Sequence, residues 1–578
     1  MRLYLLGTCP LLLLLLPATA HAADLYVAPT GSDTAAGTQA DPLATMAKAQ
    51  TLAKAGDTVF FRGGTYAYTK GTNSCSSGTA SISGVTLDKS GAAGSTINYF
   101  AYPGEVPVLD FDGIRDSCRI KGILVTGNYI HLKGLELKGV RQNNDLNHES
   151  WGIWIQGSHN TFETLNLHNM MGPGLFIARG SDNLVLNCDS HDNFDEHTSN
   201  GAGESADGFG CHVDANETGN VFHGCRAWWN TDDGYDFINA ESACTVEYSW
   251  AWLNGYKPGT MESIGNGNGF KGGGYGADAK QFPPANQQMQ HTVRFCLAFA
   301  NKAAGFYANH NPVSEFFYNN TSFGNHPDFN MLGENGAGAA ITVGVYRNNI
   351  ALGGTLFSGN DKGPAPDDAS NSWNTAGVTV TEADFQSVAT TGMDAPRQAD
   401  GSLPLLPNFR LKADSDLIDK GVDLKLPFAG KAPDLGAFEV GLDMPVVVGG
   451  SGNLPGTAGT TSGGVTSGGA TMTGGATTSG GVTSGGATTT GGATTSGGAV
   501  TTTGGDVTVS GGSGGSGSSQ AGATSNPTAG ASAGNTDTPN PADTGAGCTC
   551  RVGSRERSER AWFWLLPAWL LIRRRRAA

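Results

Sequence analysis

The chain has 578 residues, of which 87 are Gly, while only 15% are charged and 8% are aromatic. This composition, with no long helical periodicity, excludes a coiled coil and a multi-span membrane protein. The formal net charge is −16, and because the residues after Cys550 are strongly basic, the body before them is more acidic still. Such a body is a poor binder of nucleic acid, whose phosphates require a basic surface.

The N-terminus has the pattern of a secretory signal. Met1-Arg2 precede an apolar run that ends at Leu16, and Ala20-His21-Ala22 then supply small residues for cleavage. The run is too short to span a bilayer. We therefore predict a signal peptide over residues 1–22 and a mature protein that begins at Ala23.

A short helix and then strands are expected next. Asp41-Pro42 have the residue types of an N-cap and a first turn, which predicts a helix from there to about Ala55. Thr58–Phe61 is typical of a strand. One amphipathic helix followed by strands indicates a cap on a β architecture.

Short β-rich runs that end in Asn then recur along the chain. The terminal residues are Asn169, Asn193, Asn230, Asn254, Asn301 and Asn325. Their spacings of 24, 37, 24, 47 and 24 residues indicate a coil of constant length with insertions. Asn suits such a corner because it tolerates a left-handed backbone and can bond to the Asn of the next coil. We predict an all-β fold, a right-handed parallel β-helix solenoid with a short N-terminal capping helix.

A second column consists of Gly-aromatic pairs whose rings are expected to stack inside the solenoid. The pairs are Gly208-Phe209, Gly234-Tyr235, Gly269-Phe270 and Gly305-Phe306. Neighbouring coils lie about 4.8 Å apart, so Asp207 should lie beside Asp233, and Asp236 beside Lys271. Asp232 stands at the same turn, and four carboxylates and one Lys therefore converge.

These residue types favour a metal site. Clustered carboxylates repel one another unless a cation joins them, and Ca²⁺ takes six to eight oxygen ligands. Asp is also a common turn former, and a Ca²⁺ site can be purely structural. Lys271 is either a salt-bridge partner or, beside bound Ca²⁺, a neutral amine that acts as a base.

A base beside Ca²⁺ suits β-elimination from a uronate. The metal binds the sugar carboxylate, the amine removes the C5 proton, and the glycosidic oxygen leaves C4. This chemistry also explains how an acidic protein would bind an acidic polysaccharide.

The motifs of this region resemble those of family 9 polysaccharide lyases, the pectate lyase group. They are Asp207-Gly-Phe, Trp229-Asn-Thr-Asp-Asp-Gly-Tyr-Asp236, Asn268-Gly-Phe-Lys271 and Asn309-His310-Asn311. The resemblance runs from about Asp24 to Glu439. It implies a secreted pectate lyase acting on polygalacturonate, with Lys271 as catalytic base. It also implies four Ca²⁺ ligands, namely Asp207, Asp232, Asp233 and Asp236.

Two other functions are compatible with the same residues. The first is a lyase or hydrolase on the same scaffold that acts on another acidic polysaccharide, and a hydrolase would use paired carboxylates and leave Lys271 without a role. The second is a non-catalytic adhesin that binds acidic glycan through Ca²⁺ alone. Arg226 could bind a substrate carboxylate or form a surface ion pair. His310 fits a hydrogen-bonded turn better than a general acid. Alternation predicts that about half of Trp228, Trp229, Trp250 and Trp252 point into the core.

The seven Cys of the body are an odd number and fit no zinc signature, so we expect buried thiols with one or two disulfides. We predict a lyase domain over residues 23–446 and expect it to be monomeric. After it, residues 447–547 lack aromatic side chains and are almost entirely small or polar, which predicts a disordered linker.

The last segment, residues 548–578, has a Cys motif, an apolar stretch and an Arg cluster. This order resembles the C-terminal sorting tails of myxobacterial surface proteins (the MYXO-CTERM type), which implies anchoring at the cell surface. The simpler interpretation is a weak membrane-surface anchor with basic flanks.

Overall fold

The computed structural model describes residues 22–72, 75, 80–143, 150–197, 201–274, 290–309, 311, 315–330, 344–354 and 367–442. The predicted linker and tail, and all of the predicted signal peptide except Ala22, lie outside these residues, and their boundaries stay predictions. In the described part of the chain, no helix is long and apolar enough to cross a membrane.

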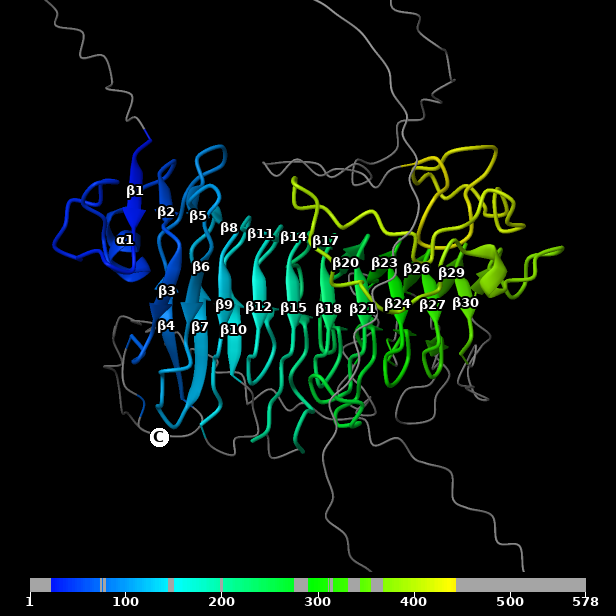
Figure 1. Ribbon diagram of the computed structural model, residues 1–578, viewed down its shortest axis with the longest axis horizontal. Helices are drawn as coiled ribbons and strands as arrows, with labels where there is room; N and C mark the ends of the chain where they lie inside the picture. The colour runs from blue at the N-terminus through cyan, green and yellow to red at the C-terminus, as the bar shows by residue number, and fades with distance from the viewer. Residues whose placement is uncertain are drawn as a thin grey trace, which may run out of the picture. The chain divides into compact units, whose positions relative to one another are not determined.

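The strands form three parallel sheets, and each full coil supplies one strand to each sheet in turn (Figure 1). The twelve-stranded sheet contains β1 (Asp24–Val27), β2 (Thr58–Phe61), β5 (Ile97–Ala101), β8 (Ile130–Lys133), β11 (Thr161–Glu163), β14 (Leu184–Leu186), β17 (Asn220–His223), β20 (Cys244–Glu247), β23 (Thr292–Arg294), β26 (Phe316–Tyr318), β29 (Val345–Arg347) and β31 (Asp367–Ala369). The ten-stranded sheet contains β3 (Gly64–Ala67), β6 (Pro107–Asp110), β9 (Glu136–Lys138), β12 (Asn166–His168), β15 (Asp189–His191), β18 (Arg226–Trp228), β21 (Trp250–Trp252), β24 (Leu297–Phe299), β27 (Thr321–Phe323) and β30 (Ile350–Leu352). The nine-stranded sheet contains β4 (Ser81–Leu87), β7 (Arg119–Val125), β10 (Trp151–Ile155), β13 (Leu175–Ile177), β16 (Phe209–Cys211), β19 (Tyr235–Asp236), β22 (Phe270–Lys271), β25 (Phe306–Tyr307) and β28 (Phe329–Asn330). The predicted all-β parallel β-helix is confirmed.

The N-terminal helix α1 (Met46–Leu52) is present but shorter than predicted. Its N-cap is Thr45, whose hydroxyl accepts a hydrogen bond from the backbone N–H of Lys48 at 3.0 Å. Asp41 does not cap the helix, because its carboxylate accepts from the N–H of Ala36 at 3.0 Å. The prediction missed the competing cap four residues further on.

The aromatic column stacks inside the solenoid as predicted. Phe209, Tyr235, Phe270 and Phe306 lie on consecutive coils, with ring centroids 4.7 to 5.1 Å apart. All four are almost fully buried. The column therefore fixes the register of the coils that carry the predicted acidic residues.

The Asn column is real, but its geometry differs from the prediction. The side chains of Asn193, Asn230, Asn254, Asn301 and Asn325 bond from coil to coil at 2.8 to 3.0 Å. We call these five residues the ladder Asn. The residue before each of them, and not the Asn itself, has the left-handed backbone. Asn169, with a φ of 55°, is such a preceding residue and is not part of the ladder. A ladder Asn bonds to the next coil through its backbone N–H as well as its amide, so the preceding residue makes the turn.

Two disulfides join Cys75 to Cys118 and Cys211 to Cys244, which agrees with the expected one or two. The remaining thiols of the described residues, Cys188, Cys225 and Cys296, are buried.

The segment after β31 includes a short 3₁₀ helix, η3 (Glu382–Asp384), and packs on the outer face of the ten-stranded sheet. Its Phe385, Phe409 and Phe438 form one apolar cluster with Trp228, Trp250 and Trp252. Trp229 also packs against this cluster. The prediction that half of these Trp side chains enter the solenoid core is therefore wrong, and Ala227 and Ala251 take the inward positions.

A buried ion network fastens this segment to the solenoid. Asp189 accepts from Arg226 at 2.7 Å and from Arg397 of the segment at 2.6 Å. Arg226 also donates to the backbone carbonyls of Met393 and Ala395, at 3.0 and 2.8 Å. The predicted ion pair of Arg226 is therefore present, but it is buried rather than at the surface. The guanidinium is fully engaged, so the predicted contact with a substrate carboxylate is wrong.

We expect Asp189→Asn to lower the free energy of unfolding by about 3 kcal/mol at neutral pH, because it leaves two buried guanidinium groups without a carboxylate. Burial alone would raise the pKa of Asp189, but Arg397 and Arg226 outweigh it and lower this pKa to about 2. A lowered carboxyl pKa stabilises the fold above the unfolded pKa of about 3.9, and this stabilisation is lost as the pH falls through 2.

Urea unfolding at pH 7 and near pH 2 checks this expectation, with the exposed Asp423→Asn as the matched control. The deficit of the Asp189 variant should shrink toward the lower pH. A deficit that is equal at both values would show that the ion network does not cause it.

Candidate functional site

The predicted acidic residues lie at the corner where the chain enters the nine-stranded sheet. Gly208 donates its N–H to the carbonyl of Asp233 at 2.9 Å, and Gly234 donates to that of Asn268 at 2.8 Å. Asp207, Asp233 and Asn268 are therefore neighbours on three consecutive coils. A side chain at Gly208 would place its Cβ 2.6 Å from the carbonyl oxygen of Gly234, so Gly permits this close stacking.

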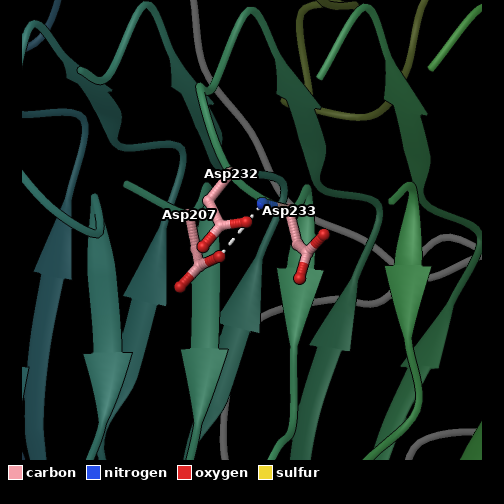
Figure 2. Close-up of side chains that lie close together, drawn as sticks. All are labelled: Asp207, Asp232 and Asp233. Carbon is pink, nitrogen blue, oxygen red and sulfur yellow. Dashed lines mark hydrogen bonds between the residues drawn. The ribbon is translucent and has the colours of Figure 1, made fainter. Parts of the chain in front are cut away.

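Three carboxylates meet at this corner (Figure 2). Asp207, Asp232 and Asp233 each offer one oxygen, and these oxygens lie within 4.8 Å of one another. All three side chains are buried. Among the described residues, this is the one cluster of His, Cys, Asp or Glu with a geometry that could hold a metal ion.

Backbone and amide donors anchor one oxygen of each carboxylate. Asp207 Oδ1 accepts from the N–H of Asp233 at 3.1 Å, and Asp232 Oδ1 accepts from that of Asn266 at 3.2 Å. Asp233 Oδ1 accepts from both the backbone N–H and the side-chain amide of Asn268, each at 2.7 Å. The carboxylates are thus held in place by the protein itself.

Lys271 lies directly beside the cluster. It is the register partner of Asp236 on the preceding coil, as predicted. Its Nζ is 3.0 Å from Asp233 Oδ2 and 3.3 Å from Asp236 Oδ2. Asp236 itself is not one of the three clustered carboxylates, and its Oδ1 accepts from the N–H of Ile238 at 2.7 Å. Lys271 therefore bridges Asp236 to the cluster.

Burial and mutual repulsion dominate the electrostatics of the cluster. Burial raises the pKa of Asp207 and Asp232 well above the usual value, and the neighbouring carboxylates raise both further. Burial also raises the pKa of Asp233, although Lys271 partly offsets this. Burial alone would lower the pKa of Lys271, but Asp233 and Asp236 outweigh it and raise it well above the usual value.

One ammonium does not balance four buried carboxylates, and the excess charge fits a divalent cation. Ca²⁺ prefers carboxylate and carbonyl oxygens. Asp207, Asp232 and Asp233 have the donor chemistry and the convergence for such an ion, and Asp236 lies one step away. These roles stay predictions.

Sequence reasoning missed two side chains at the site. Asn268 was recognised in the column, but its amide contact with Asp233 was not predicted. His212 follows β16, and its ring lies 4.5 Å from that of Phe176. Burial, and to a lesser extent Lys271, lower the pKa of His212 to about 3, so the ring is neutral. An isolated His has no repeat to mark it. His310 lies outside the described residues.

A cavity of about 410 Å³ opens where earlier coils leave the ten-stranded sheet, and the segment after β21 also lines it. It is lined in part by Lys138, Arg141, Met171, Phe194 and Lys257, and it does not include the carboxylate cluster. The carboxylate cluster and Lys271 are therefore separate from this cavity.

Comparison with known proteins identifies the fold. The family described as "Pel9A-like, right handed beta helix region" matches residues 25–349. The chain belongs to this family. The match also confirms the predicted hand of the solenoid.

Similar proteins are polysaccharide lyases. Pectate lyase L of Dickeya chrysanthemi is 35% identical over 424 residues, covering 72% of this chain and 90% of the relative. Pectate lyase L of Paenibacillus polymyxa is 34% identical, covering 70% and 84%. A solved rhamnogalacturonan lyase has a TM-score of 0.61 at 32% identity, covering 68% and 97% of the two chains. The crystal structure of pectate lyase Pel9A has a TM-score of 0.58, also at 32% identity, covering 72% and 96%. This Pel9A-like chain is a polysaccharide lyase.

We expect Asp232→Asn to stabilise the metal-free protein by at least about 1 kcal/mol, since it removes one repelling buried charge and keeps the shape of the side chain. Urea unfolding in a chelator measures this change. Asp233→Asn is the matched control, and it should stabilise the protein less than Asp232→Asn, because it also breaks the ion pair with Lys271. A destabilised Asp232 variant in chelator would contradict the charge imbalance described above.

Proposed function

We propose that the chain is a Ca²⁺-dependent pectate lyase that cleaves polygalacturonate by β-elimination. The observation that carries this proposal is the position of Lys271. Its amine lies 3.0 Å from Asp233, which belongs to the three-carboxylate cluster, and 3.3 Å from Asp236 beside the cluster. The similar pectate lyases support an acidic pectic polymer as substrate.

The proposed ligands are Asp207, Asp232, Asp233 and Asp236. When bound, Ca²⁺ would hold the uronate carboxylate of the substrate and withdraw charge, which acidifies the C5 proton. With the carboxylates neutralised by a cation, the electrostatic pull on the Lys271 ammonium falls, and the amine can lose its proton.

Neutral Lys271 then takes the C5 proton onto Nζ. The C5–H electrons form the C4=C5 double bond, the C4–O bond breaks, and the leaving oxygen takes a proton from water. One product carries an unsaturated uronate at its new end. The other product keeps the glycosidic oxygen and has a new reducing end. Asn268 keeps its amide on Asp233 beside this reaction without carrying charge.

Two alternatives from the sequence lose support. A non-catalytic adhesin does not fit membership in a lyase family. A hydrolase would need a free carboxylate pair, whereas Asp233 is engaged by Lys271 and Asn268. The solved rhamnogalacturonan lyase supports a second candidate substrate, rhamnogalacturonan, for the same site.

We also propose that the enzyme acts outside the cytoplasm. Residues 1–22 would direct secretion, residues 447–547 would form a tether, and residues 548–578 would be processed or retained at the cell surface. The support is the sequence pattern of these three segments. We propose that the lyase body acts as a monomer and binds no nucleic acid.

Incubation of the full chain with polygalacturonate should increase the ultraviolet absorbance of unsaturated uronates with Ca²⁺ and not with a chelator. An increase in this absorbance with rhamnogalacturonan and not with polygalacturonate would assign the second substrate. New reducing ends without absorbance would indicate a hydrolase and overturn the proposal.

In the same assay, Lys271→Ala should lower kcat by about 10³-fold or more, since it removes the base. Its Ca²⁺ affinity, measured by calorimetry, should stay within about threefold, because the ammonium is a competing cation rather than a ligand. Asp233→Ala should lose both turnover and Ca²⁺ binding. Near-normal turnover of the Lys271 variant would exclude this mechanism.

Deletion of residues 548–578 should move the protein from the cell surface to the medium, in a host with the matching sorting machinery. Immunoblots of surface, medium and cytoplasmic fractions measure this shift. A deletion within the linker that keeps the tail is the control and should stay at the surface. Equal release of both variants would contradict a sorting role for the tail.

A further inference from the structure

We propose that Asn309, Asn311 and Glu315 are positioning residues for Lys271. Together they form what we call the rear bracket, a buried polar support for the chain segment that follows the base. The inference rests on the proposed function only in so far as Lys271 is the base of that reaction.

Three Gly residues follow Lys271 and allow the bracket to approach the backbone. A Cβ at Gly272 would lie 2.7 Å from Glu315 Oε1, and one at Gly273 would lie 2.5 Å from His291 Nε2. A Cβ at Gly274 would collide with the carbonyl of Asn309. Gly273 and Gly274 also have positive φ angles of 100° and 74°. The segment after the base is therefore pressed directly against polar side chains and backbone.

The bracket holds this segment by its carbonyl groups. The amide of Asn309 donates to the carbonyl of Gly273 at 2.6 Å. The amide of Asn311 donates to Glu315 Oε1 at 2.9 Å and makes a longer contact of 3.4 Å with the carbonyl of Gly272. Glu315 thus orients Asn311, and the two Asn side chains engage consecutive peptide groups after Lys271.

The bracket is buried, as a rigid support should be. Asn309, Asn311 and Glu315 are 3%, 0% and 1% exposed. Burial raises the pKa of Glu315 well above its usual value. Burial therefore favours the neutral form of Glu315, and in that form its oxygen accepts from Asn311 as the amide oxygen of Gln would.

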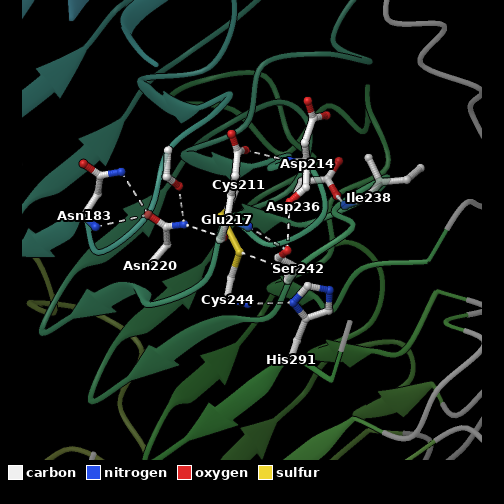
Figure 3. Close-up of a disulfide and its surroundings, with 11 residues drawn as sticks. Asn183, Cys211, Asp214, Glu217, Asn220, Asp236, Ile238, Ser242, Cys244 and His291 are labelled. Atoms are coloured by element: carbon white, nitrogen blue, oxygen red, sulfur yellow. Dashed lines mark hydrogen bonds between the residues drawn. A yellow bond between two sulfur atoms is a disulfide. The ribbon is translucent and has the colours of Figure 1, made fainter. Parts of the chain in front are cut away.

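His291 connects the same region to the strand that follows Asp207. Its Nδ1 accepts from the N–H of Cys244 at 3.0 Å, and Cys244 is disulfide-bonded to Cys211 of β16 (Figure 3). Asp236 lies near this disulfide in the same view. The segment after the base therefore packs at Gly273 against a His that is hydrogen-bonded to this disulfide-linked Cys.

Lys271 needs such support because its strand is short. β22 has two residues, and Lys271 is the last. Its neighbours in the sheet are Asp236 and Tyr307, and its side chain is paired with Asp233 and Asp236. The peptide groups that follow it lie outside the strand and fix the direction of its backbone. A displacement of about 1 Å at a reacting group can cost about 10²-fold in rate. The bracket engages those peptide groups.

A second column of buried Asn residues, Asn160, Asn183 and Asn220, offers a clear contrast. Asn160, for example, is fully buried and donates its amide to the carbonyl of Gly127 at 3.1 Å, far from Lys271 in the sequence of coils. Its side chain also accepts from the N–H of Ile130 at 2.8 Å. Asn160→Ala therefore removes a comparable buried amide without touching the segment after the base.

The test compares Asn311→Ala, Glu315→Ala and Glu315→Gln with Asn160→Ala, all in the full chain. We expect the first two to lower kcat by about ten- to a hundredfold, with KM and calorimetric Ca²⁺ affinity within about threefold of wild type. Glu315→Gln should restore kcat to within about threefold. Asn160→Ala should lose stability but keep kcat.

A second readout does not depend on the substrate. The rate of Lys271 acetylation, followed by peptide mass spectrometry with Ca²⁺ present, should rise severalfold in Asn311→Ala and Glu315→Ala, and not in Asn160→Ala. If wild type shows no elimination, the proposed function fails, and this readout still decides whether the bracket positions Lys271.

Unchanged kcat and unchanged acetylation in the bracket variants would overturn the inference. So would a parallel loss of Ca²⁺ affinity and kcat, or a failure of Glu315→Gln to restore activity, since each would show a general role in folding. An equal loss of kcat in Asn160→Ala would have the same meaning.

Discussion

The parallel register between successive coils is the constraint on which the site depends. Each backbone position recurs at about 4.8 Å in the next coil, so side chains far apart in sequence become neighbours along a column. Gly208 and Gly234 allow this at the acidic corner, because a Cβ at either would lie 2.6 Å from a carbonyl oxygen of the next coil. The close approach of Asp207 and Asp233 is thus a consequence of residues that carry no side chain.

Columns that bring charges together must also end. In the first acidic column, Asp207 and Asp233 are followed by Asn268, which donates its amide to Asp233 instead of adding a third negative charge. In the second, Asp236 is followed by Lys271, which pairs with it. On the coil that follows Asp233 and Asp236, a neutral Asn and a positive Lys therefore take the two column positions, and the run of carboxylates ends there. The remaining imbalance is concentrated on the preceding coils, where the carboxylates converge.

The parts of this structure that repeat could be predicted, and the parts that do not repeat could not. The Gly-aromatic pairs located the core column and the neighbours Asp236 and Lys271, because periodicity survives in sequence. Arg226 was misjudged because its partners Met393 and Ala395 lie 167 and 169 residues away and leave no periodic trace.

The same reason explains the Trp side chains. Their alternation in the strands is real, but the segment after β31, rather than solvent, covers the outward positions. The Asn corner shows a different limit. The sequence spacing identified the turn, but not which residue of the turn each Asn occupies. Asn169 stands one position before the place that Asn193 takes in the next coil. The hydrogen bond from the N–H of Met170 to Asn193 shows this register.

The length of the strands explains why side chains carry so much of the local structure at the site. In the nine-stranded sheet, β4 and β7 have seven residues each, whereas β19, β22, β25 and β28 have two. Short strands make few ladder hydrogen bonds, so such segments open more easily. Asn268 and the rear bracket supply hydrogen bonds that the sheet no longer provides. Because these strands are so short, Asp236 and Lys271 each stand at the last position of a strand. The chain turns away from the sheet immediately after each of them.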